Sequence, residues 1–177
     1  MIFSLIPFSA QKAPEISISG MVRRKKNIFS VHYTLAGELE EIVFPSRIEN
    51  ATRKDDLWRM TCFEFFLAAK GSPQYWEFNL SPSGDWNFYA MDAYRQVNMR
   101  EETRIQRLQF NVQKKVESFS LEADIDLNQI FPEDILIEAG ITSVIKTKDG
   151  RESYWALIHP HPEADFHLRN SFVLEIP

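Results

Sequence analysis

Two carboxylates, a phenol ring and an amide lie close together in the most aromatic stretch of the chain, 57–95. Glu64 and Glu77 are a candidate pair for glycoside hydrolysis, because that reaction uses two carboxyl groups at the bond that breaks. Tyr75 and Asn79 stand at alternate positions on either side of Glu77. Rings beside carboxylate and amide groups can instead bind the apolar face and the hydroxyl edge of a ligand such as a sugar. Both carboxylates are expected mid-strand, on a face with other hydrogen-bonding residues, where ligand acceptors explain the pattern as well as catalytic groups do. Hydrolysis is therefore the less favoured alternative.

Alternating apolar and polar residues predict that short strands position these side chains. The run CFEFFL, 62–67, directs Glu64 to the side opposite two phenylalanines, and the run YWEFNL, 75–80, directs Glu77 away from its apolar residues. Turns rich in Gly, Ser and Pro separate these runs from each other and from 86–91, so we expect three antiparallel strands. One buried face and one solvated face is the simpler interpretation of such a sheet. A binding surface on the polar face is the alternative.

Two polar loops border this stretch. The first, 47–56, is a loop or a single helical turn that leads to Trp58, so a large ring is expected at the mouth of a strand rather than inside it. The second, 95–104, begins at Arg95. Loops carried by a rigid scaffold are common places for functional residues, so Trp58 and Arg95 are candidates for the rim of a site.

Length and composition indicate one globular domain, 1–177. The chain has 177 residues, of which 44% are hydrophobic, 25% charged and 13% aromatic. This length buries about two-thirds of the surface that the unfolded chain exposes, and the high aromatic content suits strands. The formal net charge of −5 argues against a nucleic-acid partner, which requires concentrated Lys and Arg. The basic cluster 23–26 is expected to be a turn between strands.

The single cysteine and the N-terminal residues suggest a soluble, cytoplasmic protein. Cys62 cannot form an intramolecular disulfide and is expected to be a small strand residue. The apolar start of the chain has no basic leading segment and contains Pro7, so a first strand, 2–8, is favoured over a signal peptide. No run approaches the roughly 20 apolar residues of a membrane span, so no membrane partner is expected.

The remaining sequence predicts an all-β fold with minimal helix. Short alternating runs separated by turn residues give about ten to twelve strands, as in a two-sheet antiparallel β-sandwich of jelly-roll type. We expect a short strand at 41–44, a break at Gly140 within 135–145, and a tight turn at 149–150. The last strand is expected to direct Phe172, together with Leu174 and Ile176, inward.

Histidines are concentrated near the C-terminus, but common nucleotide and nucleophile motifs are missing. The sequence contains no glycine-rich phosphate loop and no G-x-S-x-G. His159, His161 and His167 lie within nine residues, and one of them could ligate a metal or haem iron. The favoured interpretation is a rigid, proline-containing loop whose imidazoles bond to neighbouring backbone groups.

Several motifs resemble the DOMON-like superfamily, which includes carbohydrate-binding module family 9. They are Trp58, the strand TCFEFFL, the sequence YWEFN followed by SPSGDW, and near the C-terminus YWALIH and DFHLRNSFVLE. The resemblance covers most of the chain and is most specific at 57–92. It implies a β-sandwich that binds sugars or haem without catalysing a reaction.

In the sugar-binding members of this superfamily, two tryptophans clamp a saccharide while a glutamate and an amide hold its hydroxyls. The resemblance assigns these roles to Trp58, Glu64 and Asn79, with Glu77 beside them. It leaves no match for the second tryptophan, because the last one is Trp155, and Phe166 and His167 occupy the comparable region.

The resemblance also raises the question of a cofactor. The aspartate usual in the strand motif is Thr61 here, which argues against a structural calcium ion. In haem-binding members a Met and a His ligate iron, and the candidates in this chain are Met60 and Met91 with the three C-terminal histidines. We expect no cofactor, with haem or calcium as the less favoured alternatives.

The leading hypothesis is a non-catalytic domain that binds a carbohydrate or polyol on a concave sheet face. Trp58 would stack on the ring of the ligand, and Glu64, Tyr75, Glu77 and Asn79 would contact it from the sheet, while Arg95 and His167 would close the rim. A haem-binding electron-transfer domain and a protein-interaction module are the alternatives. The sequence identifies no protein partner.

Overall fold

The computed structural model describes residues 1–9, 13–94 and 99–177. These residues form 12 antiparallel strands, and no helix among them is longer than a single 3-10 turn. None of the helices in the described ranges is long and apolar enough to cross a membrane. The strands are β1 (Ile2–Pro7), β2 (Ile16–Lys25), β3 (Ile28–Gly37), β4 (Cys62–Ala69), β5 (Tyr75–Leu80), β6 (Trp86–Met91), β7 (Arg100–Glu101), β8 (Phe110–Lys114), β9 (Ser118–Asp126), β10 (Ile137–Lys146), β11 (Glu152–Ala156) and β12 (Leu174–Ile176), and the 3-10 turns are η2 (Leu57–Arg59) and η3 (Arg169–Ser171).

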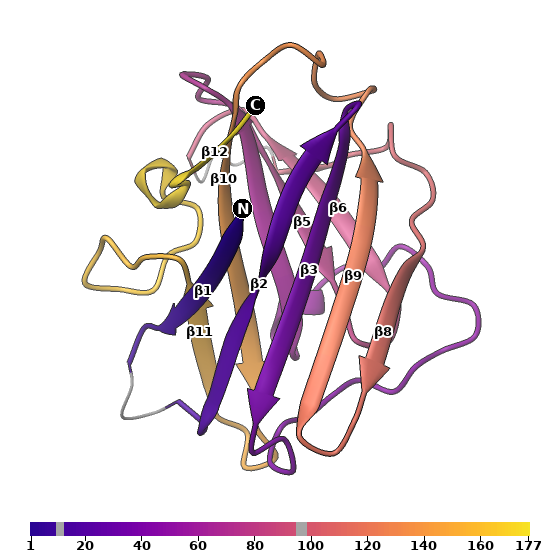
Figure 1. Cartoon of the computed structure of the whole chain (residues 1–177), viewed down its shortest axis with the longest axis vertical. Helices are drawn as coiled ribbons and strands as arrows, with labels where there is room; N and C mark the ends of the chain where they lie inside the picture. Colours follow the sequence, from indigo (N-terminus) through magenta and orange to yellow (C-terminus); the bar gives the residue numbers. More distant parts are fainter. Residues whose placement is uncertain (10–12, 95–98) are drawn as a thin grey trace.

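All 12 strands belong to one curled sheet. Its order is β7-β6-β5-β4-β10-β11-β1-β2-β3-β9-β8, and β12 pairs with β10. The sheet bends so that β2, β3, β9 and β8 lie in front of β4, β5, β6 and β10 (Figure 1). The all-β prediction is therefore confirmed, but the division into two separate sheets is not, because β1 joins the two layers. Its residues 2–5 pair with β2, and its residues 6–7 pair with β11.

Stacked aromatic rings fill the space between the two layers. Phe65 of β4 stacks on Phe29 of β3 at a centroid distance of 5.0 Å and on Phe78 of β5 at 4.5 Å. Phe63, two residues earlier, packs against Tyr33 at 5.1 Å. These side chains are fully buried, and such pairs contribute about 0.5–1.5 kcal/mol each beyond their buried area. The strand phase predicted for 62–80 is confirmed, since Phe63, Phe65 and Phe78 point inward and Glu64 points outward.

Three local predictions need correction. Residues 41–44 form a single bridge from Ile42 to Thr147 instead of a strand. β10 continues through Gly140 without a break. A Cβ added at Gly140 would lie 2.9 Å from Cδ1 of Phe172, so this glycine allows an aromatic ring to approach the outer face of the strand. Phe172 therefore packs on the outside of the sheet rather than inward.

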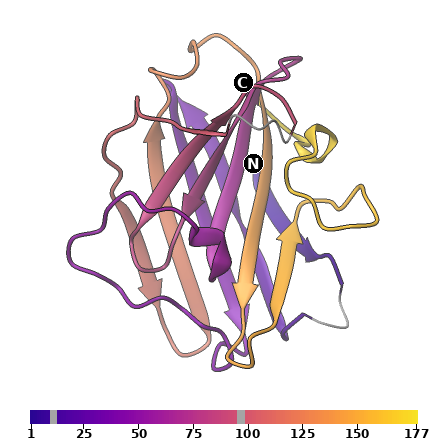
Figure 2. The same ribbon diagram turned by 180° about the vertical axis from the view of Figure 1, so that it is seen from behind.

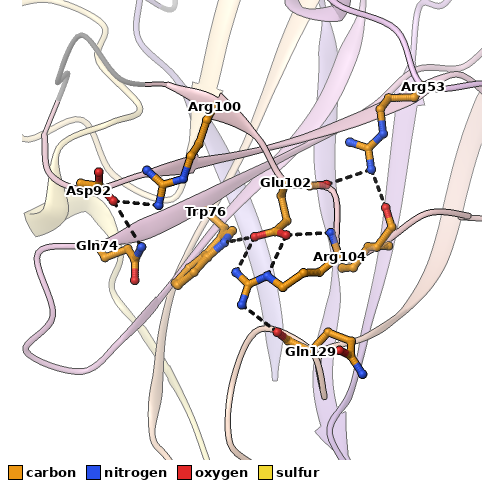
Figure 3. A network of polar contacts seen from close by, with 9 residues as sticks. Arg53, Gln74, Trp76, Asp92, Arg100, Glu102, Arg104 and Gln129 are labelled. Carbon is orange, nitrogen blue, oxygen red and sulfur yellow. Dashed lines mark hydrogen bonds and ion pairs between the residues drawn. The ribbon is translucent and has the colours of Figure 1, made fainter.

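Ion pairs and hydrogen bonds centred on Glu102 fix the segment that follows β7 (Figure 3). Oε2 of Glu102 accepts from Trp76 Nε1 at 2.9 Å and from Arg104 Nη2 at 2.5 Å. Arg53 donates to the carbonyl oxygen of Glu102 at 2.9 Å and stacks on the ring of Trp86 at 4.4 Å. The network thus ties the loop before η2 to the edge of the sheet.

Replacing Glu102 with Gln is expected to lower the free energy of unfolding by about 1–3 kcal/mol at pH 7, because hydrogen bonds to a charged group are lost. Burial alone would raise the pKa of this carboxyl, but the bonds from Arg104 and Trp76 lower it to about 2. The stabilisation is therefore present above the ordinary pKa of about 4.5 and disappears as the pH falls toward 2.

Thermal denaturation at several pH values tests this expectation, since 1 kcal/mol corresponds to about 2–4 °C in a domain of this size. Glu101→Gln is the matched control. Glu101 is exposed and pairs with Arg53 at 3.5 Å, so its loss should cost at most about 1 kcal/mol. Equal melting temperatures for the two variants at pH 7 would contradict the assigned role of Glu102.

Candidate functional site

A cavity of about 520 Å³ lies on the outer face of the layer that contains β4 and β5. Two segments far apart in sequence enclose it, one around η2 and one between β11 and β12. Figure 2 shows η2 in front of the strands and the C-terminal segment beside β11. The residues that line the cavity are Trp58, Arg59, Glu64, Phe66, Glu77, Met99, Val144, Glu152, Tyr154, Ala164, Phe166 and His167.

The outer face of this layer is covered rather than solvated. Tyr75 and Asn79 are fully buried, although both point away from the core between the layers. Phe66, Tyr75 and Phe172 belong to a second apolar cluster on this face, completed by Ala68, Tyr89 and Met91 and flanked by Trp58 and Phe166. The simpler expectation of an open polar face is therefore wrong, because the two covering segments turn that face into an enclosed site.

Glu64 and Glu77 form a pair of buried carboxyl groups in the cavity wall. They lie on neighbouring strands, where Glu64 is opposite Asn79 and Glu77 is opposite Phe66. Oε1 of Glu64 is buried and has no hydrogen-bond partner among the residues that the structure describes. Burial and the nearby Glu77 carboxyl raise the pKa of Glu64 well above its usual value, and burial raises the pKa of Glu77 to about 7. Near neutral pH the pair therefore retains a proton that the same groups would lose in water.

Asn79 acts on the neighbouring carboxyl and does not itself line the cavity. Its Nδ2 donates to Oε1 of Glu77 at 2.9 Å, and its side chain is fully buried. This bond orients Glu77 and partly offsets the effect of burial on its pKa. The sequence thus predicted the correct neighbourhood for Asn79, and the structure places it behind a cavity residue.

Tyr75 and His167 are linked at the C-terminal side of the site. The hydroxyl of Tyr75 lies 3.0 Å from Nδ1 of His167, and Nε2 of His167 lies 4.0 Å from Oε2 of Glu77. His167 lines the cavity, whereas Tyr75 lies beneath it in the second apolar cluster. Arg95, the other rim residue predicted from the sequence, lies outside the described residues.

Trp58 lies over the sheet at the η2 side of the cavity. Its indole packs edge-on against Tyr89 of β6, with 5.8 Å between the centroids. The hydroxyl of Tyr89 donates to Oδ1 of Asp55 at 2.7 Å, and Asn87 donates to the same oxygen at 2.9 Å. Residues of β6 and of the preceding loop therefore hold the ring over the site. As predicted, the ring lies outside the strands.

Several cavity residues were not predicted as site residues. Phe66 has the same outward phase as Glu64, so the alternation of β4 could have identified it. Glu152 and Tyr154 share the outward side of β11 in the same way. Phe166 comes from an irregular segment with no periodicity, and the signal for it in the sequence is the resemblance, which places it in the region of the second tryptophan. Trp155, the last tryptophan, is buried in the core between the layers and does not line the cavity.

The residues considered for haem or calcium are dispersed. Of these, His167 lines the cavity, whereas His159 contacts the carbonyl oxygen of Ile6 and His161 is exposed. Met60 is exposed and Met91 is buried beside Tyr75, the residue it pairs with in the sheet. Thr61, which stands where the strand motif usually has an aspartate, is buried, and its hydroxyl accepts from the backbone N–H of Lys146 at 3.1 Å. Within the described ranges, no group of three or more His, Cys, Asp or Glu is arranged to hold a metal ion.

No protein-family model and no curated protein matches the sequence. Solved structures do match the fold. A proposed carbohydrate-binding protein from Bacteroides uniformis aligns with a TM-score of 0.72 and 12% identity over 97% of this chain and 83% of that chain. A carbohydrate-binding module of family 9 from Caldicellulosiruptor kristjanssonii, in complex with glucose, aligns with a TM-score of 0.55 and 12% identity over 93% and 77% of the two chains. A structure of such a module from the same organism, in complex with cellotriose, aligns with a TM-score of 0.51 and 13% identity over 82% of this chain and 67% of that chain.

These alignments extend over most of the chain at very low sequence identity. The predicted resemblance to carbohydrate-binding module family 9 is therefore confirmed at the level of the fold: the chain shares its architecture with carbohydrate-binding proteins that include family 9 modules.

Proposed function

We propose that this protein binds a saccharide in the cavity without catalysing its conversion. The observation that carries the proposal is the combination of aromatic rings at the cavity wall with a buried carboxyl oxygen, Oε1 of Glu64, that has no partner in the described part of the chain. A buried acceptor without a hydrogen bond costs about 1–3 kcal/mol, and a ligand hydroxyl can satisfy it. The fold shared with carbohydrate-binding proteins supports this proposal.

The two rings of the proposed site lie on the same face of the layer, at opposite ends of the cavity. Trp58 contacts Tyr89 on β6, and Phe166 contacts Tyr154 on β11 with 6.0 Å between the centroids. Strands β5, β4 and β10 lie between β6 and β11 and carry the polar groups. A sugar ring between Trp58 and Phe166 would direct its hydroxyls toward Glu64, a geometry that suits a ligand with apolar faces and a polar edge.

The position of the carboxyl groups favours binding over hydrolysis. Glu64 and Glu77 lie diagonally on adjacent strands of the same wall. Glycoside hydrolysis needs one carboxyl group on each side of the scissile bond, or an acid and a nucleophile about 5 Å apart that face it from two directions. Two groups on one wall, one of which has a buried oxygen without a partner among the described residues, are better suited to accept hydrogen bonds from a ligand.

Titration calorimetry with glucose, cello-oligosaccharides and other neutral sugars tests the proposal. Binding in the micromolar to millimolar range is expected, and Phe166→Ala should weaken it roughly fivefold, because about 1 kcal/mol of apolar contact is lost. Phe8→Ala is the control, since Phe8 is partly exposed and packs on His159, away from the cavity. If wild type binds no sugar, or if Phe166→Ala and Phe8→Ala bind equally well, the proposed function is wrong.

A further inference from the structure

The charged groups that line the cavity differ in how they are compensated. Glu152 and Arg59 line the cavity, and each has a partner of opposite charge. Oε1 of Glu152 pairs with Nζ of Lys146 at 2.6 Å, and Nε of Arg59 pairs with Oδ1 of Asp56 at 3.2 Å. Glu64 and Glu77 do not, because among the described residues no lysine or arginine lies within 4.0 Å of either carboxylate.

The groups packed around the carboxyl pair are mostly neutral or acidic. These groups are the Cys62 thiol on β4, the Tyr89 hydroxyl on β6 and the Tyr154 hydroxyl on β11. The pKa of each is raised, mainly by burial and then also by the charge of Glu64 or Glu77. Glu152 also lines the cavity from β11, and Arg59 lines it from η2. The C-terminal segment contributes His167, whose Nε2 is 4.0 Å from Glu77 and thus beyond the range of a good hydrogen bond. Ion pairing among the described residues of the site therefore leaves an excess of acceptors and of negative charge.

Building on the proposed saccharide-binding function, we propose that the preferred ligand is an amino sugar, with its ammonium group against Glu64 and Glu77. An ammonium group has three donors and no acceptor, which suits the unpartnered oxygen of Glu64 and the second oxygen of Glu77. Hydrogen bonds between ions are about twice as strong as those between neutral groups. The ammonium group also supplies a full positive charge, which no lysine or arginine of the described residues places within 4.0 Å of this pair.

Other sugars satisfy the pair less completely. The hydroxyl of a neutral sugar can donate to Oε1 of Glu64, but it leaves the charge of the pair uncompensated. A uronic acid would add a carboxylate to a site that already buries two carboxyl groups, which costs free energy because like charges repel strongly in a low-dielectric site. When an amino sugar binds, the proton held by the carboxyl pair is released to solvent as the ammonium replaces it.

Calorimetric titration of the full chain at pH 7 with glucosamine, glucose, N-acetylglucosamine and glucuronic acid tests the proposal. Glucosamine is expected to bind at least about tenfold more tightly than glucose or N-acetylglucosamine, which keeps the nitrogen but removes its charge. Glucuronic acid is expected to bind most weakly. If neutral sugars bind as tightly as glucosamine, the amino-sugar proposal is overturned while the saccharide-binding function stands. If none of the four sugars binds, both fail.

The double variant Glu64→Gln/Glu77→Gln identifies the groups responsible. Its preference for glucosamine over glucose should fall to about threefold or less, whereas Glu122→Gln, on the outer face of the opposite layer, should retain it. Titrations in two buffers of different ionisation enthalpy count the protons released. Wild type should release up to about one proton per glucosamine bound, and the double variant close to none. Proton release that is unchanged in the double variant would contradict the assignment to this pair.

Discussion

Trp58→Ala is expected to weaken saccharide binding by about thirtyfold or more. The indole is the largest ring at the cavity wall, and covering such a side chain with a ligand contributes about 2 kcal/mol, which corresponds to this change in affinity. Because Trp58 is partly exposed before the ligand arrives, the variant should fold normally. Its melting temperature is expected to stay within about 3 °C of wild type.

Intrinsic fluorescence offers a sharp measurement, because the chain has four tryptophans and the other three are buried away from the cavity: Trp76, Trp86 and Trp155. A spectral change on sugar addition should therefore come from Trp58 and disappear in Trp58→Phe, which keeps a smaller ring in the same place. Trp58→Phe is expected to retain part of the affinity by calorimetry. Equal sugar affinity in wild type and Trp58→Ala would exclude this ring from the site.

Glu64→Gln is expected to stabilise the unliganded protein at alkaline pH. The pKa of Glu64 is raised in the folded state, mainly by burial and then by Glu77, so the folded protein holds a proton that the unfolded chain has already lost. Stability therefore falls as the pH rises from the ordinary pKa of about 4.5 toward the folded values, of which that of Glu77 is about 7. A glutamine cannot ionise, so it removes this loss.

The expected gain is at least about 1 kcal/mol at pH 8, or about 2–4 °C in melting temperature, and it should vanish near pH 4. Thermal melts of wild type and Glu64→Gln from pH 4 to pH 8 measure it. Glu122→Gln is again the control, because Glu122 is exposed on the other layer and does not line the cavity. A Glu64→Gln variant less stable than wild type at pH 8 would show that the carboxylate is better solvated than its burial implies.

Sequence alternation predicted the phase of β4 and β5 correctly, because one face of these strands packs against a core. Every second residue of 63–67 and 76–80 is an apolar side chain that must be buried, and a shift of one residue would expose all of them. The outward positions of Glu64 and Glu77 follow from the same constraint. Since Trp58 precedes the strand in a polar connection, its place outside the strands was predictable as well.

The cover of this face was not predictable from local patterns. Phe166 and His167 belong to an irregular segment, and its position depends on contacts with residues distant in sequence, such as Phe66 at 5.3 Å from His167. Gly140 illustrates the same limit. A glycine in a strand sequence is compatible with a break or with close approach of another group, and only the ring of Phe172 decides between them. The continuity of the sheet through β1 is likewise a long-range pairing that leaves no mark in composition.

One strand, β10, contributes to the floor of the cavity and also anchors the C-terminal segment that covers it. Val144 lies in its floor, the bare backbone at Gly140 receives Phe172, and residues 137–139 pair with β12 at the end of the covering segment. Floor and roof are thus anchored to the same piece of backbone. Because they share this strand, the floor and the C-terminal cover should keep their separation when the two layers shift relative to each other.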